Sequence, residues 1–217
     1  MRFLLLAVGI FLFMTQAGQA AEFQVAGQTL SISPPHGYCA LDRNNPSDAP
    51  VIERLEKSQA GRNQVLMSFA LCSELADWRA GRIPYYKHYG NVTVQLQDGS
   101  PQKLQSSRAD FIASMEETMP KIDPAEVDRE VSTRTGEITG SQLLGIIGKD
   151  SNALYIGLLV SLKAEGQPIV LAGVTSFTLL KSIVVNTNLY EPASADAHEH
   201  LLSIQQPYLA QLVQRNP

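Results

Sequence analysis

Positive charge is scarce and scattered in this sequence, unlike in most proteins that bind nucleic acids. It contains 17 Lys and Arg against 21 Asp and Glu, a net charge of −4, and no basic run. Proteins that contact phosphates do so with clustered Lys and Arg, so this composition argues against nucleic acid as the main partner. The sequence also contains no internal repeat, low-complexity stretch or linker, and we therefore expect one domain.

Long apolar runs are missing after the first 20 residues. A helix that crosses ~30 Å of hydrocarbon needs roughly 20 consecutive apolar residues. The best candidate, residues 143–162, is interrupted by Lys149 and Asp150. We expect sheet at this position, and no membrane span in the mature chain.

Catalytic signatures are absent as well. There is no Gly-X-Ser-X-Gly, the turn that presents the nucleophile of many serine hydrolases. The four histidines of the sequence are His36, His88, His198 and His200. A Ser-His-Asp group assembled from distant segments stays open as an alternative. We predict no catalytic residue and no cofactor.

Residues 1–20 have the three parts of a secretory signal. A positive charge at Arg2 precedes an apolar run over residues 3–14, and small residues follow, among them Gly18 and Ala20. The run is too short for a membrane anchor. We expect cleavage after Ala20, which leaves residues 21–217 as a mature domain in a bacterial periplasm or outside the cell. No cysteine stands at the cleavage point, so we expect no lipid attachment there.

The two cysteines, Cys39 and Cys72, both lie in the mature part. An even count in an oxidising compartment indicates a disulfide first. The residues around each cysteine read as strand, which favours a bridge between neighbouring strands. The alternative is a catalytic thiol, which needs an unpaired cysteine and a positioned histidine.

Apolar periodicity and turn residues predict an α+β fold, with a mainly antiparallel sheet covered by helices. One helix is expected between an N-cap at Ser47 and a stop at Gly61. A second should open at Ser107, whose spacing to Asp110 is that of a capping box. The other expected elements are a hairpin or bent strand at residues 23–33, strands at 64–72 and 91–97, and a charged helical turn at 123–130.

The C-terminal part predicts a four-strand antiparallel meander followed by a terminal helix. The strands are expected at residues 142–148, 153–164, 169–179 and 182–190, with polar turns between them. A helical period begins near Ser194 and continues toward the C-terminus. Pro207 should kink this helix or restart it as a second one.

The order of these elements, with the turn Ser33-Pro34-Pro35-His36-Gly37-Tyr38 leading into the first long strand, resembles the PsbP-like α/β/α sandwich family. The resemblance covers most of residues 23–215 and is one of layout. It implies a central antiparallel sheet between helices and a non-catalytic binding or accessory role. Fold alone does not determine function.

Aromatic and cationic side chains are interleaved in one segment, residues 78–89. The candidate partner-binding residues in it are Trp78, Arg79, Arg82, Tyr85, Tyr86, His88 and Tyr89. Exposed Trp, Tyr and Arg dominate binding hot spots, and loops on rigid sheets often hold binding sites. Stacking on sugars or contact with a protein would both suit this segment. In the alternative interpretation, the aromatic rings fold inward and anchor a long loop.

Two further stretches carry potential cation ligands. His198 and His200 follow Asp196, and imidazole groups bind zinc or copper. On a helix, however, positions i and i+2 point about 200° apart, so we predict a solvated helix start and no metal site. Residues 42–48 superficially resemble a calcium loop but lack the required glycine and terminal acidic residue.

We therefore expect an exported, non-enzymatic binding or accessory module that acts on a protein or an envelope polymer. The alternative is a metal-dependent or hydrolytic periplasmic enzyme that uses His198 or His200 with nearby carboxylates. The sequence does not indicate an oligomeric state.

Overall fold

The computed structural model describes residues 20–119, 138–164 and 167–217 of the chain. Most of the expected signal, residues 1–19, and the expected helical turn at residues 123–130 lie outside these ranges. In chain order the described elements are β1 (Ala21–Val25), β2 (Gln28–Ile32), β3 (Tyr38–Ala40), α1 (Ala49–Gln59), β4 (Asn63–Leu71), α2 (Cys72–Arg79), β5 (Tyr89–Gln97), β6 (Ser100–Pro101), α3 (Arg108–Thr118), β7 (Ile138–Lys149), β8 (Leu154–Ala164), β9 (Gln167–Leu180), β10 (Ile183–Pro192) and α5 (Ala197–Arg215).

The fold is α+β, built on a large antiparallel sheet, as expected. The strand order is β3-β4-β5-β10-β9-β8-β7, and β6 pairs with β5 off this path. Strands β7 to β10 form the expected C-terminal meander. Because β10 also pairs with β5, the meander joins the N-terminal strands in one sheet. β1 and β2 form a separate two-stranded sheet.

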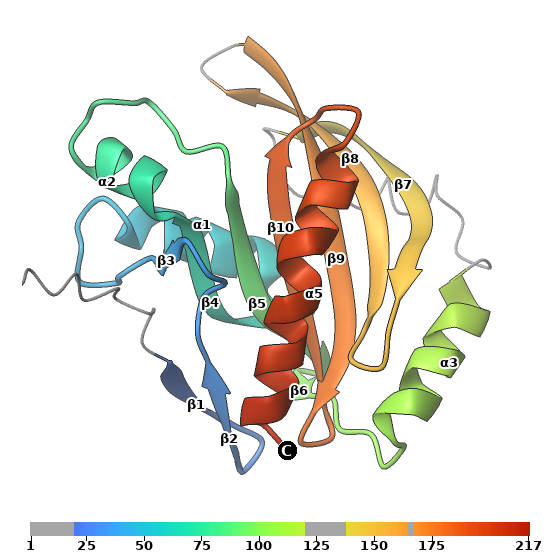
Figure 1. Ribbon diagram of the computed structural model, residues 1–217. Helices are drawn as coiled ribbons and strands as arrows, with labels where there is room; N and C mark the ends of the chain where they lie inside the picture. The colour runs from blue at the N-terminus through green and yellow to red at the C-terminus, as the bar shows by residue number, and fades with distance from the viewer. Residues whose placement is uncertain (1–19, 120–137, 165–166) are drawn as a thin grey trace, which may run out of the picture.

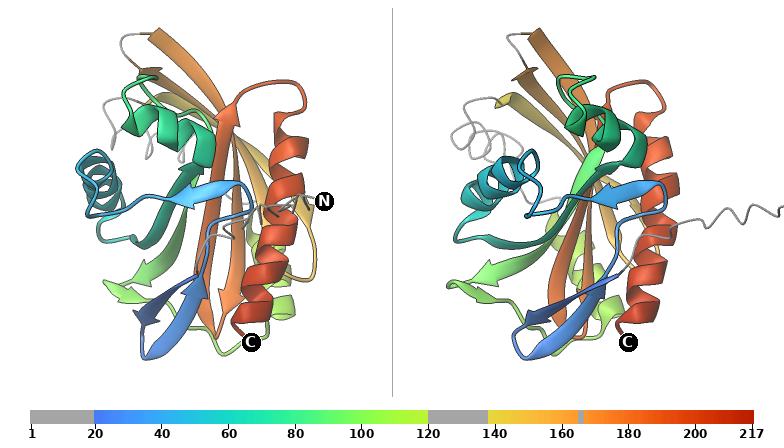
Figure 2. Two further views of the ribbon diagram at one scale, coloured as in Figure 1. Left: turned by 60° about the vertical axis from the view of Figure 1, so that its left-hand side comes forward. Right: turned by 90° about the vertical axis from the view of Figure 1, so that its left-hand side faces the viewer.

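Helices lie on both sides of the main sheet. α5 crosses one face (Figure 1), and α1 lies on the opposite side (Figure 2). The inner side of α5 buries Leu201 and Leu209 in the main apolar core. A second core cluster lies under α3, where Phe111 and Ile112 pack with Leu154 of β8. The sheet is therefore sandwiched, as the predicted layout requires.

Residues with positive φ values form several of the hairpin turns. Ala26 and Gly27 connect β1 to β2, where the sequence predicts a hairpin. The turn between β9 and β10 is less usual, because Lys181 and Ser182 have φ values of 49° and 67° without being glycine. The Nζ of Lys181 donates a hydrogen bond to the carbonyl oxygen of Thr29 at 3.1 Å. This contact fixes the strained turn against β2.

The N-terminus of α3 is capped as the sequence predicts. The backbone N–H of Asp110 donates to the Oγ of Ser107 at 3.1 Å. Ser107 is thus the N-cap, and the helix begins directly after it, at Arg108. One of the four N–H groups that a helix start leaves unpaired is thereby satisfied.

Three local expectations were wrong. The N-cap of α1 is Asp48 rather than Ser47, because the Asp48 carboxylate forms a buried ion pair that fixes its position. Of the two outcomes expected at Pro207, the restart is wrong: α5 is continuous through this residue, and its inner face packs on the sheet on both sides of it. Cys72 is the first residue of α2 and not the end of a strand.

Cys39 and Cys72 form the expected disulfide, which joins β3 to the start of α2. β3 has only three residues, each paired with β4, so the bridge reinforces a short edge strand. Both cysteines of the sequence are bridged, and neither is available as a catalytic thiol.

Within the described ranges, no helix combines the length and the apolar character needed to cross a bilayer.

Candidate functional site

The candidate segment, residues 78–89, contains more than the single loop that the sequence suggests. It comprises the end of α2, a loop over residues 80–88 and the first residue of β5. Trp78 and Arg79 are therefore helical, and Tyr89 is in a strand. In Figure 1 the connection from α2 to β5 lies at the upper left, at one end of the main sheet.

The inner side of the segment is a continuous chain of aromatic rings. Trp78 meets Tyr86 edge to face with ring centroids 5.2 Å apart, and Tyr86 meets Tyr89 in the same way at 5.9 Å. Tyr89 then stacks at 5.2 Å on Tyr190, its direct partner on β10. Gly173 makes room for the Tyr190 ring, because a Cβ there would come within 2.7 Å of it. For these rings the geometry matches the anchoring interpretation.

Burial keeps two of these phenols protonated. It raises the pKa of Tyr86 to about 12, with a further contribution from the carboxylate of Asp48, and that of Tyr190 to about 12. Both side chains are thus neutral packing groups at any physiological pH.

Glu74 of α2 fixes the end of the loop. Its Oε2 accepts hydrogen bonds from the backbone N–H groups of Lys87 and His88, at 2.7 and 2.9 Å. Its Oε1 lies 2.8 Å from the Nδ1 of the His88 ring. Burial by itself would raise the pKa of Glu74, but these hydrogen bonds and the His88 ring lower it below the ordinary value. The carboxylate is therefore held in its charged form.

Arg79 is committed to a structural ion pair. Its guanidinium bonds both carboxylate oxygens of Asp48, with Nε 3.0 Å from Oδ1. Asp48 is fully buried and also accepts a hydrogen bond from the backbone N–H of Asp42 at 2.7 Å. The pair ties α2 to the loop that precedes α1, so Arg79 is not presented to a partner.

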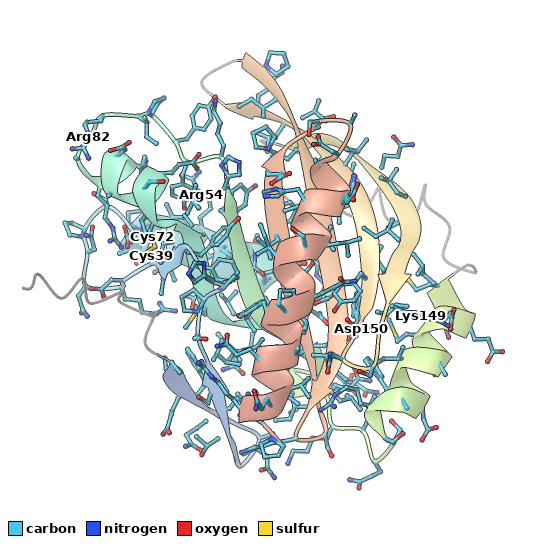
Figure 3. The ribbon with its side chains drawn as sticks, viewed as in Figure 1. Cys39, Arg54, Cys72, Arg82, Lys149 and Asp150 are labelled. Atoms are coloured by element: carbon cyan, nitrogen blue, oxygen red, sulfur yellow. A yellow bond between two sulfur atoms is a disulfide. The ribbon has the colours of Figure 1, made fainter. Side chains whose placement is uncertain are left out.

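The outer side of the loop is the tip, which we define as Arg82, Ile83, Pro84, Tyr85 and Lys87. Arg82, Pro84 and Lys87 are exposed, and the other two are partly buried. Arg82 donates from Nε and Nη2 to the Oδ1 of Asp77, at 2.8 and 2.5 Å, and its backbone N–H donates to the Asp77 carbonyl oxygen. Figure 3 shows Arg82 at the outer end of this region, beyond the disulfide. Asp77 thus orients a guanidinium that stays 61% exposed.

A group of titratable side chains lies beside the segment, between α2 and α5. Glu191 of β10 is only 5% exposed, and its Oε2 is 2.7 Å from the Nδ1 of His200 in the first turn of α5. Tyr38 is also buried. Its burial, followed by the charges of Glu191 and Glu74, raises its pKa to about 12. The carboxylates of both carboxylate–histidine pairs thus act on the same phenol.

The two C-terminal histidines engage different partners. The Nε2 of His198 lies 3.1 Å from the carbonyl oxygen of Leu158, whereas His200 bonds Glu191. Nowhere in the described parts of the chain do three His, Cys, Asp or Glu side chains gather in a way that could hold a metal ion. The geometry therefore gives no support to a metal at His198 or His200.

The loop at residues 42–48 also uses its carboxylates internally. The Oδ1 of Asp42 accepts the backbone N–H of Asn44 at 2.9 Å, and both oxygens of Asp48 are bonded to Arg79. These contacts account for the polar composition without a calcium ion.

Sequence reasoning proposed the segment but missed the residues that support it. Glu74, Asp48 and Glu191 contact it or its neighbours only through tertiary packing, at spacings that no helix or strand period links. Tyr190 had a signal, because it is an aromatic residue in a predicted strand. Its pairing with Tyr89 depends on the strand order, which the sequence does not show.

Comparison with known proteins does not assign the chain to a family. No family model and no curated protein matches the sequence. Among solved structures, it is similar to a protein of unknown function from Pseudomonas aeruginosa, at 13% identity over 88% of this chain and 95% of that chain, with a TM-score of 0.27. A likeness at this TM-score supports no argument about function.

Proposed function

We propose that this protein is an exported, non-enzymatic binding module that contacts a protein or an envelope polymer through the tip of segment 78–89. The single observation that carries the proposal is the division of this segment. Its inner side is fixed by an aromatic chain and by Glu74, while its outer side exposes two cations, Arg82 and Lys87, and a proline beside the partly buried ring of Tyr85.

Fixing the base of a binding loop in advance favours association. A loop that is already ordered loses less conformational entropy on binding, so more of the contact energy appears as affinity. Three anchors lie around the tip, namely the Tyr86 ring, the Glu74 carboxylate and the Arg79–Asp48 pair. A loop with no role beyond connection would not need this many.

The chemistry of the tip indicates the kind of partner. Arg82 and Lys87 are cationic and exposed, and Tyr85 offers a ring with a hydroxyl group. Arg and Tyr are enriched in binding hot spots, where Arg pairs with carboxylates. A partner with acidic groups at its surface is the best fit.

Export is part of the proposal. Residues 1–20 carry the composition of a signal, and the Cys39–Cys72 disulfide suits an oxidising compartment. The expected location is the periplasm or the cell exterior, after cleavage near Ala20.

Affinity capture from envelope extract tests the proposed surface. The bait is the mature protein, compared with a tip variant that combines Arg82→Ala, Tyr85→Ser and Lys87→Ala. A matched control, Lys57→Ala, removes an exposed cation on α1. The proposal expects one partner retained by wild type and control and lost with the tip variant, at unchanged melting temperature. Equal capture by all three baits would refute it.

One observation favours a second candidate, a hydrolytic enzyme. A buried carboxylate bonded to an imidazole, as in Glu191–His200, is the orienting half of a nucleophile relay. The hydroxyl of Ser203 donates instead to the backbone of His200, at 2.6 Å. Release of product from model esters by the wild type, abolished by His200→Ala, would support the enzyme. No turnover would leave the binding module as the better account.

A further inference from the structure

Most of the side chains that hold the tip in place come from one short helix, α2. They are Glu74, Asp77, Trp78 and Arg79. A helix of eight residues is marginal in water by itself, and α2 buries only Leu75. The order of the tip therefore depends on the parts of the chain that hold α2.

The stretch around β3 holds both ends of α2. At the start of the helix no side chain acts as a cap, and the backbone N–H of Cys72 donates instead to the carbonyl oxygen of Gly37 at 3.0 Å. At the other end, Arg79 is bonded to the buried carboxylate of Asp48. Gly37 directly precedes β3, and Asp48 ends the loop that follows it. Release of β3 from the sheet would therefore weaken the contacts at both ends of α2.

The disulfide is the strongest attachment of β3. This strand lies at the edge of the main sheet, has only three residues and pairs, among the described strands, with β4 alone. The bridge ties Cys39, its central residue, to Cys72 at the start of α2 (Figure 3). Neither cysteine is fully buried, so thiol reagents have access to the bridge.

We propose that the Cys39–Cys72 disulfide is a redox switch for the tip. Its formation orders α2 and the binding surface, and its reduction releases both while the rest of the sandwich stays folded. This inference rests on the proposed function of the tip. The switch confines binding to an oxidising compartment, because a chain with reduced cysteines has no ordered tip.

The chemistry of the switch is thiol–disulfide exchange. When the bridge forms, the thiols of Cys39 and Cys72 give two electrons and two protons to an oxidant that carries a disulfide, and the oxidant leaves as two thiols. Reduction by a dithiol is the reverse reaction. The two cysteines then regain two electrons and two protons, and the dithiol becomes a disulfide.

The main part of the fold does not depend on the bridge. β5 and the strands β7 to β10 are joined by backbone pairing, and α5 packs on this sheet through Leu201 and Leu209. The bridge lies outside these elements. We therefore expect reduction to open the molecule locally, at β3, α2 and the tip.

Trp78 is the single tryptophan of the sequence, so its fluorescence reports on α2 alone. The mature protein is compared in its oxidised form, after reduction with dithiothreitol, and as the double variant Cys39→Ser, Cys72→Ser. In the last two we expect the emission to shift to the red. Trypsin should cut after Arg82 and Lys87 at least about tenfold faster, because cleavage follows the population of the open loop. The sheet signal in far-UV circular dichroism should stay unchanged, and reoxidation should restore the closed tip.

Asn216→Ala is the matched control. The Asn216 side chain bonds the backbone N–H and carbonyl of Ser31, at 2.8 and 2.9 Å, next to the C-terminus and away from α2 (Figure 1). This variant loses stability with its disulfide intact, and should be cut after Arg82 and Lys87 as slowly as the wild type. Equal cleavage and emission in the oxidised, reduced and double-serine proteins overturn the switch. So does loss of the sheet signal on reduction, since the bridge then supports the whole fold.

Capture from envelope extract separates the switch from the proposed function. The oxidised protein should retain the partner, and the double variant Cys39→Ser, Cys72→Ser should lose it. Equal capture by both baits overturns the switch. A tip that opens on reduction, with no partner captured by either bait, supports the redox-dependent opening and refutes the proposed function.

Discussion

Glu74 holds His88 by two hydrogen bonds, one from the backbone N–H and one from the imidazole ring. A side chain on α2 thereby fixes the point where the loop of segment 78–89 enters β5. The same carboxylate accepts the N–H of Lys87, so two consecutive backbone donors end on one oxygen. Charged acceptors make hydrogen bonds roughly twice as strong as neutral ones. The loop is therefore attached to the helix as well as to the sheet.

Glu74→Gln should weaken this attachment. The amide keeps one acceptor oxygen and turns an N–H₂ group toward donors, so we expect a loss of about 1–3 kcal/mol in the free energy of unfolding at neutral pH. Urea unfolding of both proteins measures it.

The lowered pKa of Glu74 determines how its contribution to the free energy of unfolding changes with pH. The pKa of Glu74 in the folded protein lies below its ordinary value of 4.5, so its stabilisation is present above that value. It is lost as the pH falls through the lower folded pKa. The difference in unfolding free energy between wild type and Glu74→Gln should shrink in strong acid. A difference that stays constant from neutral pH into acid would contradict this assignment.

Neighbouring tyrosines should respond differently to the same substitution. Tyr86→Ser removes a ring that contacts both Trp78 and Tyr89, and should cost about 2–4 kcal/mol of stability. Tyr85→Ser removes a ring from the tip and should change stability by about 0.5 kcal/mol. Thermal unfolding of the two variants measures both effects. Equal losses would mean that the tip is also an anchor.

Asp48→Asn should lower the free energy of unfolding strongly for so small a change in the side chain. The substitution keeps the shape of the side chain but leaves the Arg79 guanidinium without its charged partner. Breaking a buried pair from one side costs about 3–5 kcal/mol. Because Arg79 is partly exposed, we expect the lower end of that range, measured by urea unfolding. Combining Asp48→Asn with Arg79→Met should recover part of the loss, since the unpaired cation is then gone.

Removing the disulfide should lower the free energy of unfolding by a similar amount. Cys39 and Cys72 are 33 residues apart, and closing a loop of this length stabilises a protein by about 4 kcal/mol in the chain-entropy model. Replacing both with serine should lower the midpoint of urea unfolding by the corresponding amount. An unchanged midpoint would show that β3 and α2 are held by packing alone.

Features of this fold that depend on residues close together in the sequence could be predicted, whereas those that depend on distant residues could not. The hairpin at Ala26-Gly27, the cap at Ser107 and the strands of the meander depend on neighbouring residues, and all were predicted. The cap at Ser47 was wrong because Arg79, 31 residues beyond Asp48, determines which residue ends the loop. The restart expected at Pro207 was wrong for a related reason. The local preference of this residue for a break is smaller than the gain from burying the inner face of α5.

The candidate site was predictable only in part. Interleaved aromatic and cationic residues made segment 78–89 the candidate, but sequence alone did not separate its anchors from its tip. That separation depends on Tyr190 and Glu74, which lie on other elements. In the same way, the spacing of His198 and His200, two residues apart on a helix, argued against a shared site. It did not reveal that His200 pairs with Glu191.

The most direct test of the central claim, that the tip binds a partner while the inner side anchors it, is site-specific photo-crosslinking in living cells. A photoreactive amino acid replaces Lys87 in the tip or, as a control, the exposed Lys57 on α1. We predict a single crosslinked product from position 87, which contains a different protein or is sensitive to enzymes that degrade envelope polymers, and none from position 57. No product at position 87, or the same product from both positions, would contradict the claim.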